Sequence, residues 1–175
     1  MKKVLYTTAQ VMPYRTKFFN LLANDCNLTV LYDNCKVGER NDMWIHSVNI
    51  KHKCFFLNHK YIHQIFAWLE ILFWVSKKWD VRIVGCINSK IEIVAILYMR
   101  LFHIPYILNL DGETFFEGNS IKSRMKKFMV KGAKAYLGAG EKSVRNLKKV
   151  LGNVSTCIFN FSSLTEKELV DHKQY

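Results

Sequence analysis

The sequence has few acidic residues, few prolines and no closely paired cysteines. Its 14 Asp and Glu stand against 26 Lys and Arg, a formal net charge of +12, which favours an anionic partner such as nucleic acid, an anionic membrane or a phosphorylated substrate. The five cysteines include no Cys-x-x-Cys pair, so we expect free thiols rather than a zinc site or a disulfide framework. Two prolines and no glycine- or serine-rich linker predict one compact domain.

Familiar cofactor motifs are also missing. The dinucleotide fingerprint G-x-G-x-x-G does not follow the first apolar run, and the run 138–143 lacks the spacing of a phosphate loop. His59 and His63 stand four apart without a third ligand, so no metal is predicted. The segment 61–79 is apolar almost throughout but too short and too polar to span a membrane. We therefore expect neither a bound cofactor nor a membrane span.

Apolar runs of strand and helix length alternate along the chain. Half of the residues are hydrophobic, enough to bury a sizeable core. The expected strands are residues 3–8, 27–33, 44–50, 80–85, 104–110, 134–137 and 156–161; the expected helices begin at Pro13 and cover 61–79, 91–102, 121–131, 141–151 and 165–170. This order predicts an α/β fold, a Rossmann-like doubly wound and mainly parallel sheet of about seven strands with helices on both faces.

Polar residues follow most of the expected strands. In an open parallel sheet, ligands bind outside the carboxyl ends of the strands. The segment 104–113 ends in Asp111-Gly112-Glu113, which reads equally as a turn and as two carboxylates that contact or deprotonate a ligand hydroxyl. The other candidate ligand-binding residues at strand ends are Thr8, Gln10, Arg15, Asp33, Asn34, Asn88, Ser89, Asn109, Gly138, Gly140 and Glu141.

The order of several segments resembles the amino-terminal half of a family 4 glycosyltransferase with the two-domain GT-B architecture. The matching segments are residues 12–22 after the first strand, the strand Pro105-Tyr106-Ile107-Leu108, the Lys/Arg-rich helix after it, Ala135 to Ser143, and Ile158 to Leu164. In that family this domain binds the acceptor, and a second domain, missing here, binds the nucleotide sugar. The family usually has a histidine after the central strand, whereas this sequence has Asp111 at that place.

The resemblance implies that residues 1–164 are the acceptor-binding domain and that 165–175 begin a linker or tail. The expected function is the acceptor half of an enzyme that moves a sugar from a nucleotide sugar onto a cell-surface glycan or lipid-linked acceptor in polysaccharide biosynthesis. A non-catalytic, membrane-docked subunit of a two-chain transferase is an alternative. A basic nucleic-acid-binding domain is a third, although the aromatic residues lie mostly in long apolar runs rather than interleaved with arginine.

We predict a peripheral membrane location at the cytoplasmic face of the plasma membrane from one expected helix. Residues 121–131 place Ile121, Met125, Phe128 and Met129 on one side, and contain no acid. Its basic residues, expected to meet anionic lipid together with Phe128, are Lys122, Arg124, Lys126, Lys127 and Lys131. The equal alternative is an ordinary core stripe with a solvated basic face.

Overall fold

The computed structural model describes residues 1–34, 49–57, 64–85, 87, 89–110 and 121–158. They form one sheet of seven strands in the order β3-β2-β1-β4-β5-β6-β7, and every neighbouring pair is parallel. The strands are β1 (Lys3–Gln10), β2 (Asn27–Asn34), β3 (Lys53–Phe56), β4 (Val81–Val84), β5 (Ile107–Leu110), β6 (Ala135–Gly138) and β7 (Thr156–Ile158). The predicted Rossmann-like α/β fold is confirmed.

Helices connect these strands. They are α1 (Pro13–Asp25), α3 (Gln64–Ser76), α4 (Lys90–Leu101), α5 (Ile121–Lys131) and α6 (Glu141–Leu151). Pro13 begins α1 as predicted, because the first turn of a helix needs no N–H from that residue. The bounds predicted for α5 and α6 are also confirmed. The predicted helix at 165–170 lies outside the described residues.

The strand predicted at residues 44–50 lies mostly outside the described residues. Alternating residues suggested a strand at 44–50, but the described end of that segment, Asn49 and Ile50, is not in a strand. The third strand is Lys53–Phe56, paired with β2 in the register Thr29↔Lys53 to Tyr32↔Phe56. Only the two outer residues of this edge strand are exposed, so it lacks the strict alternation that marks a half-buried strand in a sequence.

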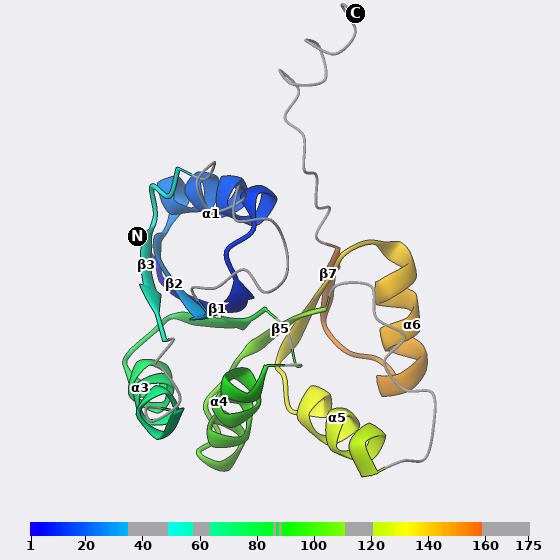
Figure 1. Ribbon diagram of the computed structural model, residues 1–175. Coiled ribbons are helices and arrows are strands. Elements are labelled where there is room, and N and C mark those ends of the chain that lie inside the picture. The colour runs from blue at the N-terminus through cyan, green and yellow to red at the C-terminus, as the bar shows by residue number, and fades with distance from the viewer. Residues whose placement is uncertain (35–48, 58–63, 86, 88, 111–120, 159–175) are drawn as a thin grey trace, which may run out of the picture.

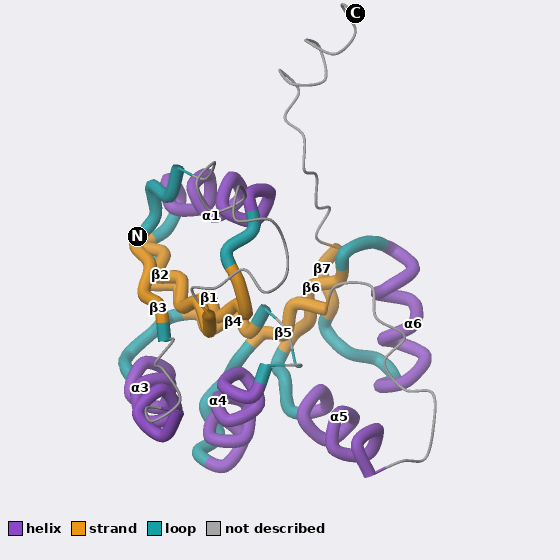
Figure 2. Tube along the Cα trace, viewed as in Figure 1, coloured by secondary structure: helices purple, strands orange, loops and turns teal. Residues whose placement is uncertain are grey.

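The helices lie in two layers, one on each side of the sheet. Figure 1 shows α1 on one face and α3, α4, α5 and α6 following one another around the other face, and Figure 2 shows the strands between them. Right-handed crossovers give this division, because the chain moves one way from β1 to β2 and the opposite way from β3 onward.

The larger core lies between the sheet and the layer of α3 to α6. Leu108 of β5 and Ile96 and Met99 of α4 are completely buried in it. Two tyrosines close the core below α5: the hydroxyl of Tyr106 donates to the Met129 carbonyl at 2.8 Å and that of Tyr136 to the Val130 carbonyl at 2.7 Å. Burial raises the pKa of Tyr106 to about 12, so both phenols act as neutral donors that hold the end of α5 on the sheet.

The smaller core lies between the sheet and α1. Phe19 of α1 is fully buried against Tyr6 and Tyr32, with ring centroids 4.8 and 6.5 Å away. Beside them His52, only 6% exposed, contacts the Tyr32 hydroxyl through Nε2 at 3.1 Å and the Asn20 carboxamide oxygen through Nδ1 at 2.8 Å. Burial lowers the pKa of His52, which favours a neutral ring within this core.

Among the described cysteines, Cys26, Cys54 and Cys157 carry free thiols, as the absence of cysteine pairs predicts. Cys26 is buried and Cys54 half-buried, whereas Cys157 on the last strand is exposed. None of the helices in the described segments is long and apolar enough to cross a membrane.

Candidate functional site

The polar residues at the carboxyl ends of the strands gather around the junction of β1 and β4. These two strands are neighbours although the chain visits β2 and β3 between them. The chain leaves β1 for α1 on one face and β4 for α4 on the other (Figure 1). A crevice outside the strand ends at such a reversal of strand order is the usual ligand site of this fold class.

Gly85 sets how closely the two strands approach at this junction. Its N–H donates to the Thr7 carbonyl at 2.8 Å. A Cβ at residue 85 would lie 2.5 Å from that carbonyl oxygen and 2.9 Å from the Tyr6 ring. Real side chains do not make contacts this short, so glycine is required by the space available rather than by an unusual backbone angle.

The first turn of α4 brings a carboxylate into the junction. Ser89 caps the helix, and its side-chain oxygen accepts from the Glu92 N–H at 3.4 Å. The Glu92 carboxylate, 1% exposed, accepts from the Thr7 hydroxyl at 3.3 Å. The Ser89 hydroxyl also donates to the Asp33 carboxylate at the end of β2. The positive end of α4 favours these negative charges, and the contacts connect α4 to β1 and β2.

On the other side of the junction, Arg15 in the first turn of α1 reaches back to β1. Its guanidinium Nη1 donates to the Thr8 hydroxyl at 2.8 Å. The Thr8 side chain is 2% exposed, whereas Arg15 is half-buried. The N-cap of α1 is Met12, which provides no side-chain cap. A basic side chain therefore accompanies the uncapped positive end of α1, an arrangement suited to an anionic ligand.

Asn109 extends the polar group onto β5. Its carboxamide nitrogen donates to the Tyr6 hydroxyl at 2.6 Å, and the side chain is 2% exposed. Its carboxamide oxygen has no hydrogen-bond partner among the described residues. Because most buried polar atoms are paired, this oxygen is an acceptor still available for a ligand group or for a residue outside the described part.

The structure brings together only part of the predicted site. Thr8 and Arg15 touch, Asn109 reaches β1 through Tyr6, and Gln10 is half-buried at the end of β1, in register with Asn34. The predicted carboxylates Asp111 and Glu113, together with Asn88, lie outside the described residues.

The predicted residues on β6 and α6 lie apart from this group, because β4 and β5 separate β6 from β1. Gly138 ends β6, and a Cβ there would lie 2.6 Å from a Val144 methyl group, so this glycine allows α6 to pack on the strand. Gly140 precedes α6 with φ of 151°, a backbone angle that favours glycine. Glu141 is exposed and lies 3.8 Å from Arg145, an ordinary pair one helical turn apart.

Sequence reasoning did not identify two residues at the junction, Gly85 and Glu92. Gly85 gives no signal of its own, because only the neighbouring strand makes it necessary. Glu92 had a signal: Ser89-Lys90-Ile91-Glu92 has the S-x-x-E spacing of a capping box before an apolar run. That spacing predicts a carboxylate in the first turn of a helix that starts at the carboxyl edge of the sheet.

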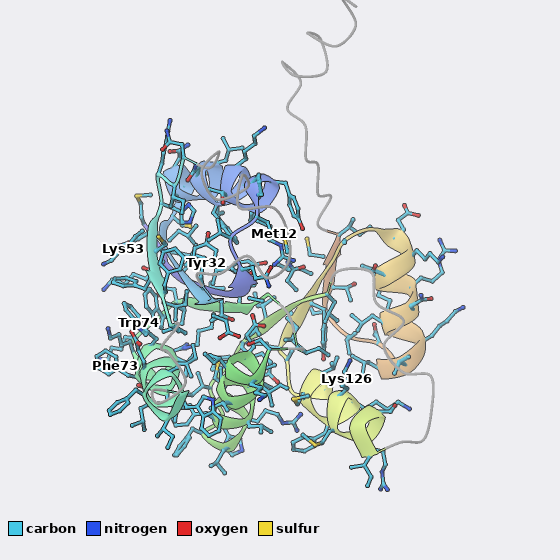
Figure 3. The ribbon with its side chains drawn as sticks, in the orientation of Figure 1. Met12, Tyr32, Lys53, Phe73, Trp74 and Lys126 are labelled. Carbon is cyan, nitrogen blue, oxygen red and sulfur yellow. The ribbon has the colours of Figure 1, made fainter. Side chains whose placement is uncertain are left out.

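The predicted membrane helix α5 needs a correction. Met129 is 2% exposed and belongs to the core, whereas Ile121, Met125 and Phe128 are exposed. Lys126 is half-buried and lies on the side of α5 nearer α6 (Figure 3). The helix turns residues four apart to one face, so it cannot present all its basic residues beside Phe128. Lys127 is half-buried as well, whereas Arg124 is exposed. The side chain of Lys122 lies outside the part of the chain that the structure describes.

An open depression of about 560 Å³ lies near the opposite edge of the sheet. It is lined by Met1, Ala23, Cys26, Asn27, Leu28, Lys51, His52 and Lys53, and Asn27 begins β2 there. Amino ends of parallel strands are not where ligands bind in this fold class, so we place the candidate site at the β1–β4 junction. Within the described segments, no group of three His, Cys, Asp or Glu side chains could hold a metal.

No family model matches the chain, and no curated protein matches it in sequence. The geometry of the junction and the resemblance in the order of segments are therefore the grounds for a function.

Proposed function

We propose that this chain is the acceptor-binding domain of a glycosyltransferase, with the acceptor seated at the carboxyl ends of β1 and β4. The observation that carries the proposal is the gathering of Arg15, Asp33, Glu92 and Asn109 around that junction. The resemblance to family 4 glycosyltransferases supports the same assignment, because in that family the corresponding domain binds the acceptor.

The junction offers the mixture of groups that a sugar requires. A hydroxyl both donates and accepts hydrogen bonds. The Asp33 carboxylate and the Asn109 carboxamide oxygen, which has no partner among the described residues, accept, and the Arg15 guanidinium donates. Arginine also binds phosphate and carboxylate groups through two parallel hydrogen bonds. A sugar that carries a phosphate or an acidic group, including a lipid-linked sugar, therefore suits this site better than a neutral sugar.

Chemistry at the acceptor needs a base close to its hydroxyl. We assign this role to Asp111 and Glu113, which follow β5 directly in the sequence. The nucleotide sugar belongs to the second domain of the GT-B architecture, so residues 1–175 by themselves should bind an acceptor without transferring a sugar. Transfer requires the donor carbon within about 3–3.5 Å of the acceptor oxygen, which a single domain does not arrange.

Amide chemical shifts in an NMR titration test the proposal. We expect glucose 1-phosphate to shift the amides of Thr8, Gly85 and Ser89 and to bind more tightly than glucose. Arg15→Met should weaken binding of the phosphate by about tenfold, the value of one charged hydrogen bond. The matched control Arg145→Met, on exposed α6, should leave it unchanged.

Three results would contradict the proposal. One is a set of shifts confined to the amino edge of the sheet, and another is equal affinity of the wild type and Arg15→Met. The third is tight, salt-sensitive binding of single-stranded DNA with no response to either sugar, which would favour the nucleic-acid-binding alternative.

A further inference from the structure

The outer sides of α3, α4 and α5 carry an apolar surface that the sheet does not use. Most of the exposed large hydrophobic side chains in the described part of the chain lie on these helices or directly after α4. We propose that this surface, the α3–α5 face, docks the protein onto an anionic lipid bilayer. This inference goes beyond the proposed acceptor site and does not depend on it.

Helix α3 shows most clearly that apolar side chains are exposed on the outer side. Ala67 and Ile71 are buried against the core, as a helix packed on a sheet requires. The opposite side should then be polar, but Ile65, Leu69 and Phe73 are 65%, 57% and 59% exposed. They recur every four residues, so they share one side of the helix. Figure 3 shows Phe73 on the side of α3 turned away from α4.

The neighbouring helices extend this surface. Helix α3 packs against α4, and α4 against α5. Leu101 at the end of α4 is 71% exposed, and Met125 and Phe128 of α5 are about half exposed, at 48% and 52%. Soluble monomers rarely expose a large contiguous apolar area. Exposed apolar side chains on three adjacent helices fit a broad contact, such as a membrane, better than a groove for one peptide.

Basic side chains lie directly on the exposed rings. The Lys77 Nζ atom is 4.0 Å from the centroid of the Phe73 ring and 3.7 Å from that of Trp74. The Arg100 guanidinium carbon is 3.8 Å from the centroid of the Phe128 ring. Side chains of this kind keep their charge at the headgroups while their apolar parts enter the boundary with the acyl chains.

The balance of charge distinguishes a bilayer from a second copy of this chain. The acidic residues of α3, α4 and α5 are Glu70 and Glu92, and Glu92 is buried. The basic residues are more numerous, and they include Arg124 and Lys131, both exposed. A two-fold dimer through this face would set the same positive surface against itself. Anionic lipid offers the opposite charge and an apolar interior at once.

Flotation with phosphatidylcholine vesicles, with and without phosphatidylglycerol, tests the α3–α5 face on the whole chain. We expect binding that requires phosphatidylglycerol and weakens at high salt. Leu69→Gln should reduce it by about tenfold, because a leucine then no longer enters the bilayer. Arg124→Glu with Lys131→Glu should reduce it by at least about 25-fold, because each lost basic residue is worth about fivefold and each new carboxylate is repelled by the anionic surface.

The matched controls lie on or beside α1, on the other face of the sheet. Leu21→Gln replaces a leucine that is 63% exposed in a helix of the same length as α3. Lys17→Glu with Lys51→Glu makes the same change in net charge as the α5 pair. Both controls should bind nearly as the wild type does.

Four outcomes of these experiments would overturn the inference that the α3–α5 face docks onto a bilayer. They are absence of vesicle binding, equal binding to phosphatidylcholine alone, equal losses in the α3–α5 variants and their controls, and a dimer in sedimentation velocity that Leu69→Gln dissociates. The last result would assign the face to a second copy. Acceptor binding measured by NMR is a separate readout, so failure here leaves the sugar proposal standing, and the reverse also holds.

Discussion

Replacing Gly85 with alanine would put a methyl group where β1 and β4 approach each other most closely. The new Cβ would lie 2.5 Å from the Thr7 carbonyl oxygen, 2.9 Å from a ring carbon of Tyr6 and 3.4 Å from the Thr8 Cβ. The first contact is about 0.9 Å closer than the ordinary separation of about 3.4 Å. The oxygen belongs to the backbone of a strand paired on both sides, so it cannot turn away as a side chain could.

We expect Gly85→Ala to lower the free energy of unfolding by about 3 kcal/mol, at the upper end for an overfilled core. For a chain of this length, that loss corresponds to a fall in Tm of roughly 6–12 °C. Urea unfolding followed by circular dichroism measures the first quantity and calorimetry the second. The N–H of residue 85, which donates to Thr7, should also exchange faster with deuterium than in the wild type.

Gly138→Ala is the matched control. Its Cβ would lie 2.6 Å from a methyl group of Val144, a half-buried side chain that can change rotamer. The loss should be about 1 kcal/mol or less, the usual size for a contact that can relax. Equal losses at the two glycines, or a loss below about 0.5 kcal/mol at Gly85, would refute the argument that the backbone contact at the β1–β4 junction decides the residue.

Three further predictions concern single side chains. Because burial lowers the pKa of His52, the unfolded chain binds the proton more readily. The free energy of unfolding should therefore fall as pH drops below about 6.5, by at most about 1.4 kcal/mol per pH unit. His52→Gln should remove this dependence in urea titrations at several pH values, whereas His103→Asn at an exposed turn should keep it. Tyr106→Phe removes the hydrogen bond to Met129 and should cost about 1–3 kcal/mol; a neutral result in urea unfolding would contradict the role of the phenol in holding α5. Ser89→Ala removes the cap of α4 and should cost about 1 kcal/mol, while Ser89→Asn should retain most of it in the same assay.

The sequence predicted the layers and most helices, because these depend on local periodicity. The proline at the start of α1 and the apolar stripe of α6 are examples. Strand β3 could not be placed, because its four residues are held by pairing with β2 rather than by a pattern of their own.

The candidate site was predictable only in outline. Polar residues at the strand ends pointed to the carboxyl edge of the sheet, where Thr8, Arg15 and Asn109 are members of the polar group at the β1–β4 junction. Their partners were not predictable from spacing, because the hydrogen bond from Asn109 to Tyr6 spans 103 residues. The requirement for glycine at residue 85 likewise arises only when β1 and β4 meet.

The order of the strands also governs how the chain can fold during synthesis. Strand β1 can pair with β2 as soon as residues 27–34 have been made, but its other neighbour, β4, is Val81–Val84. Translation at about 5–20 residues per second leaves that edge of β1 without its partner for roughly 3–10 seconds. During this interval the apolar strand is open to pairing with other nascent chains. The yield of folded protein in cells should therefore depend on the rate of elongation between codons 35 and 84.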